Sequence, residues 1–249
     1  MRVLGGFFAA VQLLTRLPVP AAWVRAEDVP RGTAWMALVG AAIGALVGGT
    51  ALLLTQTGLP PRVALLIGVG AGAWVTGALH EDGLADTADA FGGGHTREDV
   101  LRILKDSRIG SFGALALGLA LCLRVETLAS LPPALWIGAS VTAHAGARAA
   151  ASLVLAALPY ARSEGVAGNM TPGARLGACT SLLTAGALAW RLLAPTAAAS
   201  AVLATILGAL LVGFAARQRI GGQTGDVCGA AAMVAELAVL TALTSEVGA

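Results

Sequence analysis

The stretch that decides the fold class is residues 34–54, which read AWMALVGAAIGALVGGTALLL and contain no charged side chain. A helix that crosses the hydrocarbon core of a membrane needs about 20 apolar residues. Comparable runs follow at residues 61–79, 112–130, 134–158, 176–194, 196–215 and 227–243. The sequence therefore predicts an all-α, polytopic integral membrane protein with about seven transmembrane helices, formed as a single membrane-embedded domain over residues 1–249.

The composition supports a membrane protein and excludes several other classes. Hydrophobic residues make up 57% of the chain and charged residues only 12%, whereas soluble domains carry about 25% charged residues. The 33 glycines and the 4% aromatic content suit close helix packing in a bilayer. No basic, aromatic-rich stretch is present, so we expect no nucleic-acid partner. The distant Cys122, Cys179 and Cys228 are interpreted as small buried hydrophobes.

The N-terminal region, residues 1–33, differs from the apolar runs because it is amphipathic and carries several charges. Pro18 and Pro20 interrupt any helix there. We interpret this region as an amphipathic interfacial or re-entrant segment.

The distribution of basic residues predicts the orientation of the chain. If residues 80–111 face the cytoplasm, alternation of the seven spans places 159–175, 216–226 and the N-terminus on the same side. That side then holds Arg2, Arg16, Arg25, Arg31, Arg97, Arg102, Lys105, Arg108, Arg162, Arg175, Arg217 and Arg219, and the other holds Arg62 and Arg191. This bias predicts a multi-pass protein of the cell inner membrane with its polar, active face in the cytoplasm and its C-terminus outside.

The strongest chemical signal is residues 79–89, which read LHEDGLADTAD. In a helix, Asp82, Asp86 and Asp89 lie on one face at i, i+4 and i+7. Their mutual repulsion is relieved if a cation lies between them, and oxygen ligands suit Mg²⁺ or Mn²⁺. Glu81 points about 100° away from Asp82, toward solvent or toward a position behind the ligands. The alternative is a helical turn of solvated acids that interact favourably with the helix dipole.

A second polar segment contains Lys105, Asp106, Ser107 and Arg108. Lys105 and Arg108 can bind a phosphate together, the arginine through its fork of donors. Asp106 is a further metal ligand or serves to orient Arg108. The alternative for the two basic residues is that they anchor the next membrane span.

A third polar segment, residues 221–226, reads GGQTGD and precedes the last apolar run. Its glycines allow backbone N–H groups to approach an anion at a helix N-terminus, and Thr224 or Asp226 can cap that helix. Within the run itself, Glu236 is either a functional group or a buried acid that pairs with Arg148 or His144.

Four motifs together resemble a known family: TRLPVP at 15–20, LHEDGLADTADAFGG at 79–93, LKDSRIGSFGALAL at 104–117 and GGQTGDVCGA at 221–230. They are similar to the cobalamin synthase, or adenosylcobinamide-GDP ribazoletransferase, family, and the resemblance extends from about residue 7 to residue 240. Ala90 departs from the family, whose members often have Gly at this position.

The resemblance implies an integral membrane enzyme that joins adenosylcobinamide-GDP to α-ribazole or its 5′-phosphate, releases GMP and needs Mg²⁺. It implies small-molecule corrinoid and ribazole substrates and a lipid environment. The roles it implies are these: metal ligands Asp82, Asp86, Asp106, Asp226 and Glu81; catalytic residues Asp89, Lys105 and Arg108, with Asp89 as base; substrate contacts Arg16, Ser107, Gly222 and Thr224. The base is assigned by a weaker similarity to CDP-alcohol phosphotransferases, which have Ala-Arg where this chain has Ala85-Asp86.

Two other functions stay open at the level of sequence. An intramembrane prenyltransferase also uses acidic motifs, Mg²⁺ and a diphosphate, although it usually has two similar acidic motifs. A cation transporter would use Glu236, His144 and Arg148 within the membrane. The sequence leaves the oligomeric state open, a homo-oligomer included.

Overall fold

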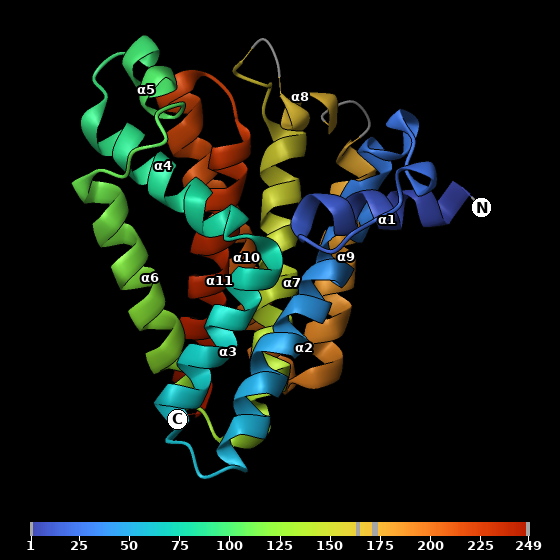
Figure 1. Ribbon diagram of the computed structural model, residues 1–249, viewed down its shortest axis with the longest axis vertical. Helices are drawn as coiled ribbons and strands as arrows, with labels where there is room; N and C mark the ends of the chain where they lie inside the picture. The colour runs from blue at the N-terminus through green and yellow to red at the C-terminus, as the bar shows by residue number, and fades with distance from the viewer. Residues whose placement is uncertain (1, 163–164, 171–173, 248–249) are drawn as a thin grey trace.

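The computed structural model describes residues 2–162, 165–170 and 174–247, and they form a bundle of long helices (Figure 1). Each of the seven apolar runs becomes a helix: α2 (Met36–Thr55), α3 (Pro61–Thr76), α6 (Ser111–Ser130), α7 (Trp136–Ala157), α9 (Ala174–Leu192), α10 (Pro195–Ile220) and α11 (Gly225–Val247). The described residues form no strand beyond an isolated bridge between Tyr160 and Gln223. The predicted all-α class is confirmed.

Shorter elements gather around one end of this bundle, the wide upper end in Figure 1. They are α1 (Arg2–Leu14), η1 (Ala21–Trp23), η2 (Ala26–Asp28), η3 (Pro30–Trp35), α4 (Leu79–Gly93), α5 (Arg97–Ile103) and α8 (Val166–Met170), whereas η4 (Pro133–Leu135) precedes α7. The helix α1 lies across the long axis of the bundle. This orientation agrees with the expected interfacial N-terminal segment.

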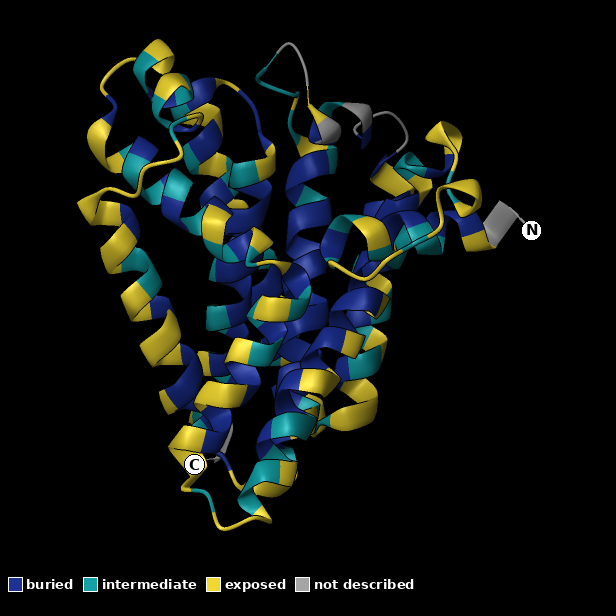
Figure 2. Ribbon diagram, in the orientation of Figure 1, coloured by how far each residue is buried: buried dark blue, intermediate teal, exposed yellow. Residues whose placement is uncertain are grey.

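The described helices differ in how well they suit a membrane. Four are long and apolar enough to span one: Pro30–Thr55, Ser111–Ser130, Pro195–Ile220 and Gly225–Ser245. The bent pair α3 and α4 adds a fifth if it counts as one span. Helices α7 and α9 are not among them, so the count of seven spans stays a prediction, as does their orientation. The sequence of α7 is less apolar because it contains His144 and Arg148, which are both buried. Most of this central helix is buried in the bundle (Figure 2).

Helix α7 is the centre of the bundle and packs against α2, α9, α10 and α11. Gly40, Gly44 and Gly48 of α2 face its backbone, since a Cβ atom at any of them would collide with a carbonyl oxygen of α7. Small residues at this spacing let two helix backbones touch. The α2–α7 contact therefore depends on the absence of side chains along this stripe.

We expect Gly44→Ala to lower the free energy of unfolding by about 1–3 kcal/mol, because the added methyl group meets the backbone at Ser140 and Val141. Gly49→Ala is the matched control, since a Cβ atom there meets nothing within 4 Å. Thermal unfolding in detergent measures both. Equal melting temperatures for the two variants would contradict the close α2–α7 contact.

A sharp break between α3 and α4 creates the polar end of the bundle. The chain turns by 89° at Gly77 and Ala78, whose φ angles are 66° and 57°. The side chain of Arg16 lies against Gly77, where an added Cβ would come within 3.0 Å of the Arg16 Cδ atom. The break directs α4 away from α3 and along α11.

Candidate active site

The acidic helix α4 is held closely against the start of α11. A Cβ atom at Gly83 would lie 2.7 Å from the carbonyl oxygen of Asp226 and 3.0 Å from the Cα atom of Gly229. The glycine is therefore needed for contact between two helix backbones. This contact brings the carboxyl groups of α4 near that of Asp226.

Asp82 and Asp86 are the unpaired acids of the site. Their carboxylates make no hydrogen bond or ion pair with any described residue; Asp82 is exposed and Asp86 is half-buried. Partial burial, followed by the neighbouring carboxylates of Asp82, Asp226 and Asp89, raises the pKa of Asp86 to about 6. A bound proton or cation would relieve this unfavourable charge.

The third acid of the predicted face, Asp89, differs from Asp82 and Asp86 because its carboxylate is hydrogen-bonded. Its carboxylate accepts hydrogen bonds from the backbone N–H of Gly110, at 2.7 Å, and of Gly113, at 2.8 Å. These amides belong to the N-terminus of α6, where backbone donors lack helical partners. Asp89 thus joins α4 to the start of α6, and its role as a base stays a prediction.

The segment 104–110 places its polar groups at the surface. Asp106 accepts hydrogen bonds from the Arg108 guanidinium, the shortest at 2.6 Å, and this interaction lowers the pKa of Asp106 to about 2. Of the two roles considered for Asp106, this geometry favours the orientation of Arg108. Lys105 and Ser107 are also exposed.

The start of α11 is built by packing as well as by capping. The Thr224 hydroxyl accepts a hydrogen bond from the N–H of Val227 at 3.3 Å, which confirms the expected helix cap. Asp226 accepts a hydrogen bond from Arg162 at 2.8 Å. Gly222 and Thr224 are buried, and a Cβ atom at Gly222 would collide with the carbonyl of Pro159. Neither of these two residues offers an open surface to a substrate in this structure.

Three arginines that the sequence analysis used to orient the chain, and not as site residues, hold the polar end together. Arg219 donates to the carbonyls of Phe91 and Gly94, at the end of α4. Arg162 donates to the carbonyl of Leu104, and Arg97 to those of Ile220 and Ala161. These carbonyls lie mostly at helix C-termini, which lack intrahelical partners. The positive charge at this face is therefore partly structural.

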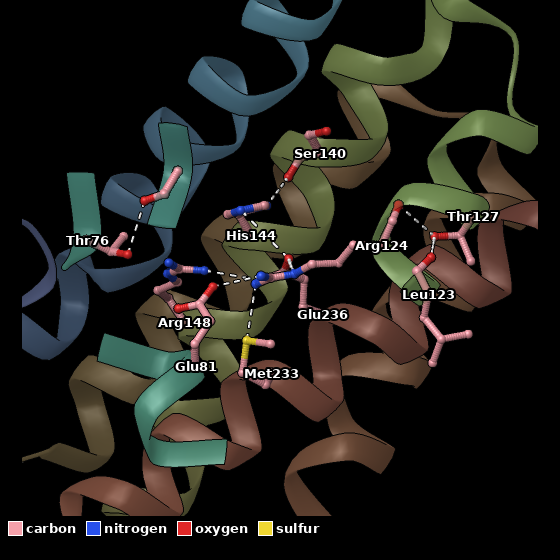
Figure 3. A network of polar contacts seen from close by, with 11 residues as sticks. Thr76, Glu81, Leu123, Arg124, Thr127, Ser140, His144, Arg148, Met233 and Glu236 are labelled. Carbon is pink, nitrogen blue, oxygen red and sulfur yellow. Dashed lines mark hydrogen bonds and ion pairs between the residues drawn. The ribbon is translucent and has the colours of Figure 1, made fainter. Parts of the chain in front are cut away.

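Beneath α4, a buried network of charged residues connects four helices (Figure 3). Arg124 of α6 donates to Glu81 of α4 at 2.7 Å and to Glu236 of α11 at 2.7 Å. His144 and Arg148 of α7 lie 3.7 Å and 3.6 Å from Glu236, as the sequence analysis expected for a buried acid. The network contains two arginines and two glutamates, so its charges balance.

The network changes the interpretation of Glu81, which the resemblance made a metal ligand. Its carboxylate forms an ion pair with the buried Arg124 guanidinium (Figure 3). The pairing follows from helix geometry, because Glu81 points to a different side of α4. The signal for it was Arg124 itself, a basic residue inside an apolar run that requires a counter-charge.

In the part of the chain that the structure describes, no three His, Cys, Asp or Glu side chains come close enough to hold a metal ion by themselves. Asp82 and Asp226 are near enough to Asp86 to influence its charge, whereas Asp106 pairs with Arg108 and Glu81 pairs with Arg124. A cation at this site would need oxygen ligands from another molecule.

Comparisons with known proteins agree with these features. The cobalamin-5-phosphate synthase family matches residues 6–244. The chain belongs to this family. It is similar to the adenosylcobinamide-GDP ribazoletransferases of Azorhizobium caulinodans, Ralstonia pickettii and Shewanella frigidimarina, at 42%, 41% and 39% identity. The matches cover 95–96% of this chain and 93–95% of the relatives. No solved structure matches the chain.

We expect Glu236→Gln to destabilise this member of the family by about 3–5 kcal/mol, because it leaves the buried arginines without their shared carboxylate. The matched control is Glu126→Gln on α6, which breaks the exposed ion pair with Arg62 and should change stability by less than about 1 kcal/mol. Melting temperatures in detergent distinguish the two. A wild-type melting temperature for Glu236→Gln would contradict the network.

The raised pKa of Asp86 predicts the pH dependence of stability. An unfolded aspartate titrates near pH 4 and folded Asp86 near pH 6, so the folded state binds more protons between these values. Stability therefore falls as the pH rises from about 4 to about 6 and stays lower above it.

Asp86→Asn should remove this loss. After allowance for solvent screening, we expect the variant to be more stable than the wild type by about 1 kcal/mol at pH 8. This difference corresponds to a melting temperature about 2–4 °C higher. The exposed Glu98→Gln serves as the control. An Asp86→Asn protein that melts below the wild type at pH 8 would rule out the crowding of carboxylates.

Proposed function

We propose that the protein joins adenosylcobinamide-GDP to α-ribazole or its 5′-phosphate and releases GMP, at the cytoplasmic face of the inner membrane. Family membership over nearly the whole chain supports the reaction, as do three relatives that carry the ribazoletransferase name. The observation that supports the position of the site is the pair of unpartnered carboxylates, Asp82 and Asp86, at the polar end of the bundle.

The donor set fits Mg²⁺, which proteins usually bind through one or two carboxylates while waters and substrate phosphates complete the shell. Asp82 and Asp86 would hold the ion, with Asp226 beside them. When bound, it would neutralise negative charge on the diphosphate of the activated corrinoid. The raised pKa of Asp86 agrees with a site whose negative charge a cation would relieve. Among the described residues no three acidic, His or Cys side chains are grouped to hold a metal ion, which agrees with a site that is completed by substrate.

The other polar groups would bind and orient the diphosphate. Lys105 and Arg108 are exposed on the segment that follows α5, and Asp106 holds the Arg108 guanidinium in place. We propose that both cations bind phosphate oxygens, with Ser107 beside them and Arg16 near the α3–α4 break. Gly222 and Thr224 would not contact the substrate directly. They would instead position the start of α11, where Thr224 caps the helix.

The base that accepts the proton of the ribazole hydroxyl would come from the same acidic face. Asp89 keeps this role in the proposal only if its hydrogen bonds to the α6 amides loosen when substrate binds. Asp89→Asn separates a base from an anchor of α6. Loss of GMP release at an unchanged melting temperature would support a base, and a lowered melting temperature with activity retained would support an anchor.

The decisive experiment incubates the purified protein in detergent with adenosylcobinamide-GDP, α-ribazole and Mg²⁺, and measures GMP and the new cobamide by chromatography. We expect Asp82→Asn and Asp86→Asn each to lower the rate by about 10²-fold or more, since each removes a carboxylate that would hold the cation against the developing negative charge. The control Glu98→Gln should keep the wild-type rate.

Removal of Mg²⁺ with a chelator should abolish GMP release, and added Mg²⁺ should restore it. Near-normal rates in both aspartate variants would overturn the assignment of the site. Release of pyrophosphate from a prenyl diphosphate, without GMP from the corrinoid, would assign the chain to the prenyltransferases instead. Cation flux in sealed vesicles without any nucleotide would support a transporter.

A further inference from the structure

An apolar groove lies on the outside of the bundle, away from the acidic site. It is formed between α7, α9 and α10 and has a volume of about 430 Å³. Its walls are aliphatic and aromatic, with Leu153, Leu182 and Phe214 among them, and Arg217 is the one charged residue that lines it. A groove of this composition suits a hydrocarbon chain that ends in an anionic group.

The groove opens toward the surface that faces lipid. Helix α10 is one of the four helices that suit a membrane span, and its outer side chains are strongly exposed, with Leu207 at 54%, Leu210 at 61% and Phe214 at 67%. Within the groove, Gly213 leaves space beside α7: a Cβ atom there would lie 3.6 Å from Val154, an ordinary contact. A side chain larger than a methyl group at position 213 would therefore extend into the groove.

Arg217 stands in the last turn of α10, at the polar end of the bundle. It is exposed and pairs with no carboxylate among the described residues, whereas Arg219, two positions later, donates to two backbone carbonyls. A guanidinium at the end of a span lies at the depth of the lipid headgroups. Its fork of donors matches the oxygens of a phosphate.

We propose that this groove binds one acyl chain of an anionic phospholipid, whose phosphate pairs with Arg217. Charge complementarity selects the occupant, because the single cation at the mouth of an apolar groove matches a phosphate attached to a hydrocarbon chain. A net negative headgroup is favoured over a zwitterionic one by about five-fold per basic residue near the surface. The site is independent of the reaction proposed above.

Native mass spectrometry of the detergent-purified full chain tests the proposal, with phosphatidylglycerol and phosphatidylcholine added separately at equal concentration. We expect the wild type to retain phosphatidylglycerol about five-fold better. Arg217→Gln should remove this preference, and Gly213→Leu, which fills the groove, should lower binding of both lipids. Arg191→Gln, an exposed arginine at the other end of the bundle, is the matched control and should behave as the wild type.

Melting temperatures show whether the Gly213→Leu protein is folded. If that variant is unfolded, Arg217→Gln still tests the proposal. Equal retention of the two lipids by the wild type would overturn the proposal. So would a phosphatidylglycerol preference that survives Arg217→Gln. A dimer that Gly213→Leu abolishes, without any retained lipid, would assign the groove to a second copy of the chain.

Discussion

The interaction on which the structure depends is the buried pairing of Arg124 with Glu81 and Glu236. In the interior of a membrane protein an unmatched charge is strongly unfavourable, so this guanidinium fixes α6 against α4 and α11, the two helices that carry its partners. Glu81 belongs to the first turn of α4, immediately before Asp82. The pairing therefore sets the rotation of α4 about its axis, and with Glu81 directed inward, Asp82 is directed outward to solvent. A contact in the core thus determines which face of the acidic helix remains free for chemistry.

The backbone provides the second constraint. The break at Gly77 and Ala78 turns α4 away from α3, and the absence of a side chain at Gly83 lets α4 lie directly on α11. Both features are needed to bring Asp226 close to Asp86, since the two residues are far apart in the sequence. Glycines also allow the close contact between α2 and α7. Helix packing through small residues therefore positions both the core and the site.

The sequence predicted what depends on local pattern. Apolar runs located the seven long helices, and the spacing of Asp82 and Asp86 placed them on one helical face. It did not reveal that Asp89 caps α6 or that Glu81 pairs with Arg124, because these partners are 21 to 43 residues away and are brought together only by packing. The hydropathy of α7 was similarly misleading as a measure of lipid contact, since this helix is enclosed by protein and tolerates His144 and Arg148.

The contrast between the two groups of charges bears on the kind of function that the fold suits. In the interior, Arg124 and Arg148 balance Glu81 and Glu236, so a cation that entered there would compete with arginines already in place. At the polar end, Asp82 and Asp86 form no hydrogen bond or ion pair through their carboxylates with the residues that the structure describes, and their repulsion persists in the folded protein. A transporter needs the opposite arrangement, with its uncompensated acid inside the membrane. Uncompensated carboxylates at one surface suit an enzyme whose charged substrate brings the remaining ligands.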